Sequence, residues 1–564
     1  MNELSAKCPI KLLEHQIEHV KKIWHAYVKD KIFSCVDSST TGLGKSHTTL
    51  YIAWMLQKMY GLKVMIVAPN DTSLHSADSW LHHAKVYGIE IMYATTYSSL
   101  RGGRGTVSHD WLIPDPENKK KWTASREFEK ICTRGVFLIF DEFHHTKNSS
   151  MSHYACAALV KMAKKYRSIC RVALISHTPG DKNEHCVQLL RMAGIMTHTK
   201  VLKHIPFTHD YEWENYGLGE LVRVCKKLSP QNAPRIDAML YRLSKAKSLI
   251  ICKELYQEFL RPEITFAMPT PKKEHKVTLV NAFLETDEDS LQVLQDGLAM
   301  LSGAVQWNNG QVGAANQWSL ANIGNGLQMI EQGKLSCIAN YVNREVEKNK
   351  NKKFVISCGA RGIENHELLR NMIYRKTTPD EYENIINELR RKNPEWSRVP
   401  KDVIKYVIMP LLSEKKKPHV LNGSVGKEKR IEIIRKFQED SRDSWCLILT
   451  PGLGSESISL HDKHGKHPRE MLIIPSFYFS QTVQSSGRVN RVGMKSEAKV
   501  MMVYCKAAAL ETSILHSMIR KTHVARDLIA EKQDVMYPGE YPFVIHGQRD
   551  EALEQSLNLL RQMV

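Results

Sequence analysis

The chain has 564 residues, which is too many for a single hydrophobic core, so two or three domains are expected. Its 42% hydrophobic and 25% charged residues are typical of a globular protein and argue against a disordered one. The 79 Lys and Arg residues exceed the 60 Asp and Glu residues and leave a formal net charge of +19. This surplus favours a polyanionic partner, either a nucleic acid or an anionic membrane surface.

The sequence does not indicate a membrane-spanning or secreted protein. Its longest apolar stretches, such as Val64–Ala68 and Val136–Phe140, are strand-sized, whereas a membrane span needs about 20 apolar residues. Met1–Pro9 lacks the apolar core of a signal peptide. The twelve cysteines include no CxxC pair, which predicts buried thiols and argues against a zinc site. We therefore expect an intracellular protein in a reducing compartment (nucleus, cytoplasm or, for a viral protein, the virion).

Residues 1–200 alternate short β-branched runs with segments of helical periodicity. The expected strands are Lys31–Val36, Lys63–Ala68, Ile89–Ala94, Val136–Phe140 and Arg171–Ile175. The expected helices are Ser46–Lys58, Ser73–His83 and Ser152–Lys165. Strands that alternate with helices predict a parallel, doubly wound sheet, so this segment is expected to form a first α/β domain.

Residues 201–330 differ in character. Helical patterns cover Gly217–Leu228 and Ala233–Leu260, and an extended piece follows at Glu263–Val280. Gly303–Gly326 is rich in Gly, Asn and Gln and has few strand signals. The segment therefore predicts a helical connector that carries a polar loop.

Strand–helix alternation returns over residues 331–520 and predicts a second doubly wound domain. The expected helix is Leu335–Lys348, and the expected strands are Lys353–Cys358, His419–Asn422, Trp445–Thr450, Met471–Ile474 and Lys499–Tyr504. A charged helical insertion is expected at 364–417, and a tail at 521–564 ends in an amphipathic helix. The predicted fold class is α/β, with two doubly wound parallel sheets joined by the connector.

A phosphate loop is indicated at Ser39–Ser46 (STTGLGKS), between a predicted strand and a predicted helix. In such a loop, backbone N–H groups and a helix N-terminus face the phosphates, Lys45 neutralises them, and the Ser46 hydroxyl binds Mg²⁺. Thr41, Gly42 and Gly44 complete the expected binding set. The alternative interpretation is a Gly-rich turn before a helix.

An acidic box, Asp141-Glu142-Phe143-His144, follows the apolar strand Val136–Phe140. A carboxylate at the end of a buried strand can reach the Mg²⁺ that Ser46 holds, and the next carboxylate can orient or deprotonate water. We therefore expect Asp141 to bind the metal and Glu142 to be catalytic. The alternative is acidic capping of a helix N-terminus.

A third motif, Gln484–Arg491 (QSSGRVNR), lies in the second domain. Arg488 and Arg491 are three residues apart, so they are expected on one helix face, from which both could reach a nucleotide across a cleft. Arginine from a separate element stabilises charge on a transferring phosphoryl group. The alternative is a pair of solvated helix arginines.

Together, the three motifs resemble those of superfamily 2 helicases and translocases, and more closely the Swi/Snf-type ATPase branch, over most of residues 10–510. Leu12–Gln16 resembles the glutamine motif, which implies that Gln16 contacts adenine. Asp141–Asn148 (DEFHHTKN) follows the extended box of the branch. Arg171–Pro179 (RVALISHTP) stands where the family couples hydrolysis to strand movement, although His177 replaces a small residue.

The resemblance implies two RecA-like lobes that clamp ATP and Mg²⁺, with Gln484 helping to position the attacking water. It also implies a nucleic-acid partner, DNA rather than RNA, and no membrane. The turns at Pro69–Asn70 and Thr96–Tyr97 are the expected contacts to the nucleic-acid backbone, and with Arg430 they mark where the basic surface should concentrate. Three functions stay open: a DNA translocase, a strand-separating helicase, and an ATPase switch that acts in transcription with a polymerase or another protein partner.

Overall fold

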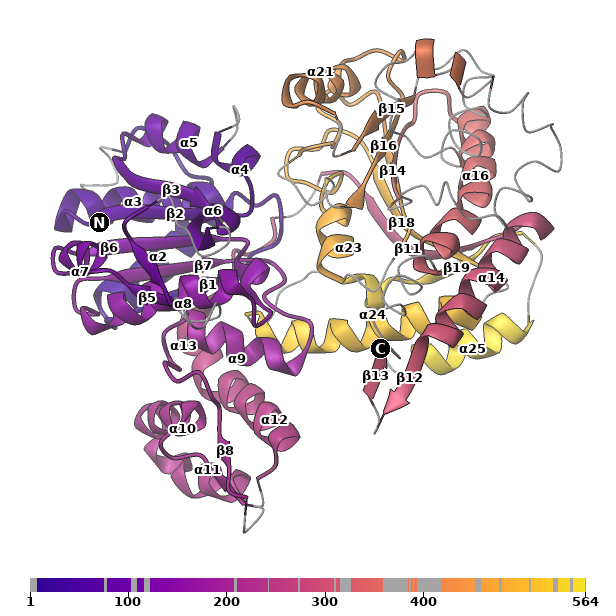
Figure 1. The fold of residues 1–564 in the computed structure, drawn as a ribbon. Coiled ribbons are helices and arrows are strands. Elements are labelled where there is room, and N and C mark those ends of the chain that lie inside the picture. Colours follow the sequence, from indigo (N-terminus) through magenta and orange to yellow (C-terminus); the bar gives the residue numbers. More distant parts are fainter. Residues whose placement is uncertain are drawn as a thin grey trace. The chain divides into compact units, whose positions relative to one another are not determined.

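In the computed structural model the chain divides into two compact units (Figure 1). The first comprises Met1–Pro271 and Lys521–Val535, and the second comprises Lys272–Arg520 and Met536–Val564. The structure describes residues 8–75, 79–102, 109–115, 122–206, 210–241, 243–271, 274–308, 311–314, 326–358, 384, 387–388, 390–392, 418–422, 425–451, 458–475, 479–506, 509–530, 536–547 and 551–562.

The first unit is built on a six-stranded sheet whose pairings are all parallel, in the order β10-β1-β7-β6-β2-β3. Its strands are β1 (Ser34–Asp37), β2 (Lys63–Ala68), β3 (Ile91–Thr96), β6 (Val136–Asp141), β7 (Arg171–Ile175) and β10 (Thr265–Phe266). All five strands expected in this region are present, with small shifts at their ends. Because β7 lies between β1 and β6, the loops that follow these three strands leave the sheet side by side.

Helices cover both faces of this sheet (Figure 1). They are α2 (Glu14–Val28), α3 (Lys45–Tyr60), α4 (Asp71–His75), α5 (Trp80–Tyr87), α6 (Tyr97–Arg101), α7 (Arg126–Cys132), α8 (Met151–Lys165) and α9 (Asn183–Met192). Successive strand residues point to opposite faces, so Val64 and Ile66 join one buried cluster while Met65 and Val67 join the other. Both faces of β2 are therefore apolar, as a doubly wound sheet requires.

The single helix expected at Ser73–His83 is instead two helices, α4 and α5. The Ser79 hydroxyl donates to the Leu74 carbonyl at 2.7 Å, so a side chain takes the carbonyl that a continuous helix would have used. As a result, Trp80 begins a new helix in the first unit.

A mostly helical insertion belongs to the first unit. It contains β8 (Lys203–His204), β9 (Tyr211–Glu212), α10 (Gly217–Leu228), η2 (Pro230–Asn232), α11 (Ala233–Met239), α12 (Lys245–Leu255), the π-helical turn η3 (Tyr256–Leu260) and α13 (Arg261–Ile264). The single helix expected at Ala233–Leu260 is thus interrupted. Leu218 and Leu255 are fully buried in the main core, which anchors the insertion to the unit. A short hairpin of β4 (Leu112–Pro114) and β5 (Trp122–Ala124) completes the unit.

The expected tail at 521–564 is not a separate element. The end of α24 (Ala509–Leu528) packs into the first unit, where Lys253 and Gln257 donate to the Asp527 carboxylate at 2.5 and 2.6 Å. Leu528 is fully buried in the core, and the Ala530 N–H donates to Ser38 Oγ at 3.0 Å. Residues 521–535 therefore contribute to the unit that carries the phosphate loop.

The second unit is built on a seven-stranded sheet, again with every pairing parallel, in the order β15-β16-β14-β17-β18-β11-β19. Its strands are β11 (Val277–Leu284), β14 (Lys353–Ser357), β15 (Pro418–Leu421), β16 (Cys446–Leu449), β17 (Arg469–Ile473), β18 (Ala498–Cys505) and β19 (Phe543–Ile545). Strand β11 falls within the expected connector, so the unit begins well before residue 331. It pairs with both β18 and β19, and its last five residues are buried.

The remaining elements of the second unit are α14 (Glu288–Ala304), β12 (Val305–Asn308), β13 (Gln311–Ala314), α16 (Leu335–Lys348), α21 (Lys427–Gln438), α23 (Phe479–Ser486), η7 (Pro538–Glu540) and α25 (Glu551–Arg561). An antiparallel hairpin, β12–β13, thus occupies part of the expected polar loop. Residues 315–325 and most of the insertion expected at 364–417 lie outside the described residues. The structure confirms the α/β class with two parallel sheets.

Two further findings concern the described part of the chain. None of its helices combines the length and the apolar character that crossing a bilayer requires. All twelve cysteines are free thiols, and every one except Cys8 is buried.

Candidate active site

The phosphate loop connects β1 to α3 at the carboxyl edge of the first sheet. Gly42 and Gly44 have φ angles of 87° and 88°, a left-handed conformation that glycine adopts without steric cost. Gly44 precedes α3, so Lys45 and Ser46 open the helix. The Lys45 amine is buried and donates to the Ser39 carbonyl at 2.8 Å. A helix N-terminus and a lysine amine thus come together in one loop, which is the arrangement that binds phosphate groups.

The glutamine motif lies directly on this loop. Gln16 Nε2 donates to the Leu43 carbonyl at 2.9 Å, and Gln16 Oε1 accepts from the Leu13 N–H at 3.0 Å. A Cβ at position 44 would overlap Gln16 Nε2. The first turn of α2 therefore packs against the phosphate loop, and a contact from Gln16 to adenine remains a prediction.

The acidic box follows β6, whose last residue is Asp141. Burial, together with the negative charge of Glu142, raises the pKa of Asp141 to about 7. Burial would also raise the pKa of Glu142, but a hydrogen bond from His144 and the positive charges of His144 and Lys45 hold it well below its ordinary value. Glu142 has a φ of 47° at the start of the 3₁₀ turn η1 (Phe143–Thr146). The backbone of Glu142 is therefore strained. Its lowered pKa means that its carboxylate is ionised.

The loop after β7 contacts the acidic box. Ser176 Oγ donates to Glu142 Oε2 at 3.2 Å and lies 3.0 Å from His144 Nδ1, which in turn lies 3.1 Å from the same carboxylate oxygen. The Thr178 N–H donates to Ser176 Oγ at 3.2 Å. Burial and the charge of Lys45 lower the pKa of His177 to about 3, so this imidazole is neutral. Movement of this loop would therefore break or shift the hydrogen bond to the Glu142 carboxylate.

These residues fit ATP and Mg²⁺. Ser46 and Asp141 carry side-chain oxygen atoms, the type of ligand that Mg²⁺ prefers. Asp141 is buried, the adjacent Glu142 is half-buried, and the charge of Glu142 raises the pKa of Asp141, which indicates negative charge that a divalent cation would neutralise. Thr41, Gly42, Gly44 and Lys45 lie in the same loop and offer N–H groups and an amine to phosphates.

The second unit carries Gln484 on α23 and the two arginines just beyond it. The expectation that Arg488 and Arg491 share a helix face is wrong, because α23 ends at Ser486 and both arginines lie in the non-helical segment after it. They nevertheless converge, since Arg488 Nη1 and Arg491 Nη2 donate to the same Ile458 carbonyl at 3.4 and 3.2 Å. Gln484 and Arg488 are buried. The segment after α23 thus brings the two arginine side chains together, as a shared helix face was expected to do.

Three residues near the site were not expected from the sequence. Trp80 donates its indole N–H to Asp141 Oδ2 at 2.8 Å. His19 Nε2 lies 3.1 Å from Asp37 Oδ2, and Asp37 Oδ1 accepts the Ser39 N–H at the start of the phosphate loop. The Tyr97 hydroxyl donates to the Asp141 carbonyl at 2.8 Å. Of the three, only Tyr97 had a sequence signal, because the turn at Thr96–Tyr97 was expected to contact the nucleic-acid backbone.

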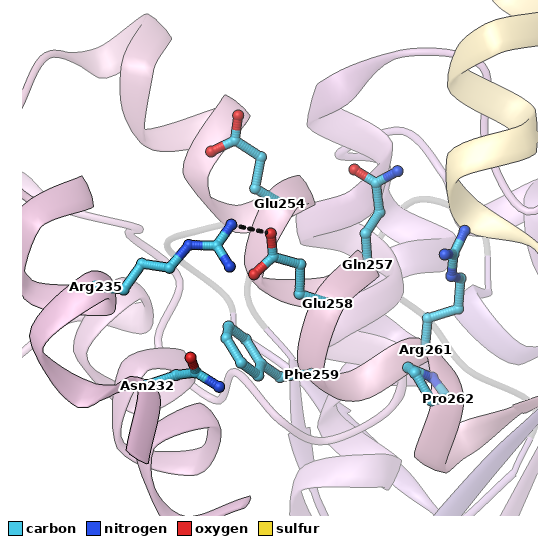
Figure 2. Close-up of a pocket in the computed structure, with 8 residues that line it drawn as sticks. All are labelled: Asn232, Arg235, Glu254, Gln257, Glu258, Phe259, Arg261 and Pro262. Atoms are coloured by element: carbon cyan, nitrogen blue, oxygen red, sulfur yellow. Dashed lines mark hydrogen bonds and ion pairs between the residues drawn. The ribbon is translucent and has the colours of Figure 1, made fainter. Parts of the chain in front are cut away.

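A pocket of about 530 Å³ lies away from these motifs, in the helical insertion (Figure 2). Its polar lining includes the ion pair between Arg235 and Glu258 at 2.6 Å, with Glu254 and Arg261 nearby (Figure 2). Gln257 also lines it and donates to Asp527. Its charged groups of both signs give no preference for a particular ligand.

Comparisons with known proteins agree with the motifs. Residues 9–176 match the family described as type III restriction enzyme, res subunit. A protein of Acanthamoeba polyphaga mimivirus, described as a "Putative ATP-dependent RNA helicase", is 22% identical over 92% of this chain and 83% of its own length. A solved structure, the Sulfolobus solfataricus SWI2/SNF2 ATPase core in complex with dsDNA, matches 94% of this chain and 98% of that chain at 15% identity. Its TM-score is 0.27.

Three observations support a likeness to helicase-type ATPases. The phosphate loop, the acidic box and the loop after β7 leave neighbouring strands of one parallel sheet. The glutamine and arginine motif lies on and just after helix α23, in the unit that is built on the second parallel sheet. The sequence matches cover the first lobe and, in the mimivirus relative, nearly the whole chain. In its motifs and in these two sequence matches, the chain resembles helicase-type ATPases of superfamily 2.

Proposed function

We propose that the chain is driven by nucleic acid, hydrolyses ATP at the interface of its two RecA-like lobes, and uses the cycle to move along duplex DNA. The observation that carries the proposal is the bond from Ser176 to Glu142. It joins the loop expected to couple hydrolysis to movement with the carboxylate expected to activate water. Lys45 lies close enough to both carboxylates of the box to stabilise their charge.

The catalytic steps follow from the chemistry of the side chains. Lys45 and the loop N–H groups would hold the phosphates, and bound Mg²⁺ would neutralise their charge. Glu142, kept ionised by His144, is suited to accept a proton from the attacking water. Arg488 and Arg491 would stabilise charge on the transferring phosphoryl group, and Gln484 would help to position water. Hydrolysis would then require closure of the lobes, because the two sets lie on different sheets.

Nucleic acid is the partner that best fits the basic composition. The surplus of +19 favours a polyanion, and the segments after β2 and β3 resemble the family's backbone contacts. Binding dominated by phosphate contacts weakens steeply with salt, so affinity should fall linearly with salt on logarithmic axes. The extended box DEFHHTKN favours movement on duplex DNA.

The second candidate function is strand separation. The mimivirus relative carries the description of an RNA helicase, and it matches this chain over 530 residues. An unwinding enzyme should release a labelled strand from a duplex. A translocase should instead hydrolyse ATP on intact duplex and displace a bound protein or a third strand.

The test is ATP turnover measured in parallel without polymer and with single-stranded DNA, duplex DNA and RNA. Stimulation by duplex DNA is expected, and stimulation by none of the polymers would contradict the proposal. Lys45→Ala and Glu142→Gln should each lower turnover, by about 10²–10⁴-fold for the loss of a general base. Lys58→Ala is the matched control, because Lys58 is exposed in the last turn of the same helix. Near-normal turnover in either site variant would overturn the assignment.

A further inference from the structure

Asp141 is held by two buried aromatic side chains from different helices. Trp80, the first residue of α5, donates its indole N–H to Asp141 Oδ2 at 2.8 Å. Tyr97, the first residue of α6, donates its hydroxyl to the Asp141 main-chain carbonyl at 2.8 Å. The exposed fractions of the two aromatic residues are only 3% and 4%. Both bonds are therefore shielded from water.

The two bonds hold different parts of the aspartate. Tyr97 fixes the main chain, and its ring is itself stacked on His145 with centroids 5.8 Å apart. The carboxylate could still rotate about its own bonds. The indole N–H is a rigid donor that cannot accept, so it fixes the carboxyl oxygen that faces it. Trp80 is thus the contact that sets the rotation of the carboxylate.

A simpler interpretation is that Trp80 only fills the core and that Asp141 satisfies its buried N–H. The same unit contains two tryptophans, Trp111 and Trp122, whose buried Nε1 atoms have no hydrogen-bond partner in the described structure. Packing of an indole in this unit therefore does not by itself require an acceptor. The bond from Trp80 to the metal-binding candidate calls for a separate explanation.

We infer that Trp80 is a positioning residue, which fixes the carboxylate of Asp141 so that its second oxygen is held for the cation of bound ATP and Mg²⁺. The inference rests on the proposed function. Contacts of this kind, which orient a metal ligand from behind, typically affect metal affinity by about 10–100-fold.

The first experiment measures ADP binding by calorimetry over a series of Mg²⁺ concentrations, using the full chain. Trp80→Phe removes the N–H and keeps an aromatic ring. We expect the Mg²⁺ concentration for half-maximal enhancement to rise about tenfold, while ADP binding in EDTA is unchanged. Trp111→Phe, which removes a buried indole N–H that has no partner, should leave the Mg²⁺ dependence as in the wild type. An unchanged Mg²⁺ dependence in a folded Trp80→Phe chain would overturn the inference.

A second experiment covers the case in which the smaller phenylalanine ring unfolds the chain. Trp80→3-benzothienylalanine keeps the bicyclic ring and replaces only the N–H with sulfur. The same shift in Mg²⁺ dependence is expected. In a chain that already carries Asp141→Asn, the Trp80 substitution should cause no further change in the Mg²⁺ dependence of ADP binding. The reason is that a residue that acts through the Asp141 carboxylate has no effect once that carboxylate is removed. Additive effects of the two substitutions would contradict the inference.

The proposed function and the role of Trp80 can be contradicted separately. A wild-type chain that neither hydrolyses ATP nor binds ADP more tightly with Mg²⁺ would contradict the proposed function, and the inference with it. A wild-type chain that does both, with a folded Trp80→Phe variant of identical Mg²⁺ dependence, would contradict the inference alone.

Discussion

Gln16 Nε2 occupies the space into which a Cβ at Gly44 would project. Gly44 also has a φ of 88°, so a side chain there meets both a steric overlap and backbone strain. We expect Gly44→Ala to weaken nucleotide binding, because the Gln16 side chain must move away from the loop and the left-handed backbone of the loop is strained. Nucleotide titration by calorimetry measures this.

Gly61→Ala is the matched control for that substitution. Gly61 ends the same helix with a φ of 67°, but a Cβ there would meet nothing within 4 Å. It should cost about 1–2 kcal/mol of stability from the left-handed conformation and leave nucleotide binding intact. Equal nucleotide affinities for the two variants would show that the Gln16 contact has no role.

Ser176→Ala should lower ATP turnover about tenfold. The substitution removes a hydrogen bond to ionised Glu142, and such bonds contribute about 1.5–3 kcal/mol. Ser34→Ala is the control, since its buried hydroxyl donates only to the Ala193 carbonyl at 2.7 Å. Steady-state turnover with and without duplex DNA separates the two variants. If both reduced turnover equally, the effect would be general destabilisation.

Arg491→Lys should reduce the rate of hydrolysis at least tenfold without weakening nucleotide binding. Lysine keeps the charge but lacks the planar fork of donors, and a supplied arginine contributes up to about 10³–10⁵ in other phosphoryl-transfer enzymes. Arg435→Lys, at a largely exposed ion pair with Glu439, serves as the control. Single-turnover hydrolysis is the measurement, and wild-type rates for Arg491→Lys would remove this arginine from the proposed mechanism.

Leu528→Ala should destabilise the chain by about 2–5 kcal/mol, because it opens a cavity in the core of the first unit. Leu559→Ala removes the same atoms from a side chain that is 67% exposed, and should change stability by less than about 0.5 kcal/mol. Denaturant unfolding of both variants compares them. A small effect of Leu528→Ala would mean that residues 521–535 do not help to stabilise the first unit.

Asp181 should make the first unit sensitive to acid. Burial alone would raise the pKa of its carboxyl, but the hydrogen bond with His185 and the charge of Lys147 hold that pKa well below its ordinary value. A carboxyl with a lowered folded pKa contributes stability that is complete above its unfolded pKa of about 3.9 and is lost as the pH falls below it. Asp181→Asn should therefore show a shallower loss of melting temperature between about pH 5 and pH 3. Parallel melting profiles for variant and wild type would contradict this.

Much of the fold and part of the site could be predicted from local patterns. β-Branched runs such as Val136–Phe140 are buried on both faces, so their periodicity signals a parallel sheet before any contact is known. The phosphate loop and the acidic box were recognisable because their chemistry needs particular residue types next to a strand end. Helix interruptions were missed where a polar side chain such as Ser79 competes for a backbone carbonyl.

Contacts between segments that are distant in the chain could not be predicted from local sequence patterns. Strand β11 belongs to the second sheet because it pairs with β18, more than 200 residues later, and no local pattern encodes such a pairing. The same holds for residues 521–535, which complete the first unit through Leu528.

The sequence by itself indicated an α/β protein with a phosphate loop and a polyanionic partner, since phosphate loops and acidic boxes are short contiguous patterns and a net charge of +19 is a property of composition. Only the tertiary structure decided that Trp80 holds Asp141, that Ser176 bonds to Glu142, and that the two arginines converge on one carbonyl. The physical reason is that hydrogen bonds depend on distance in space and reach only about 3 Å, whereas their donors and acceptors are up to 61 residues apart along the chain.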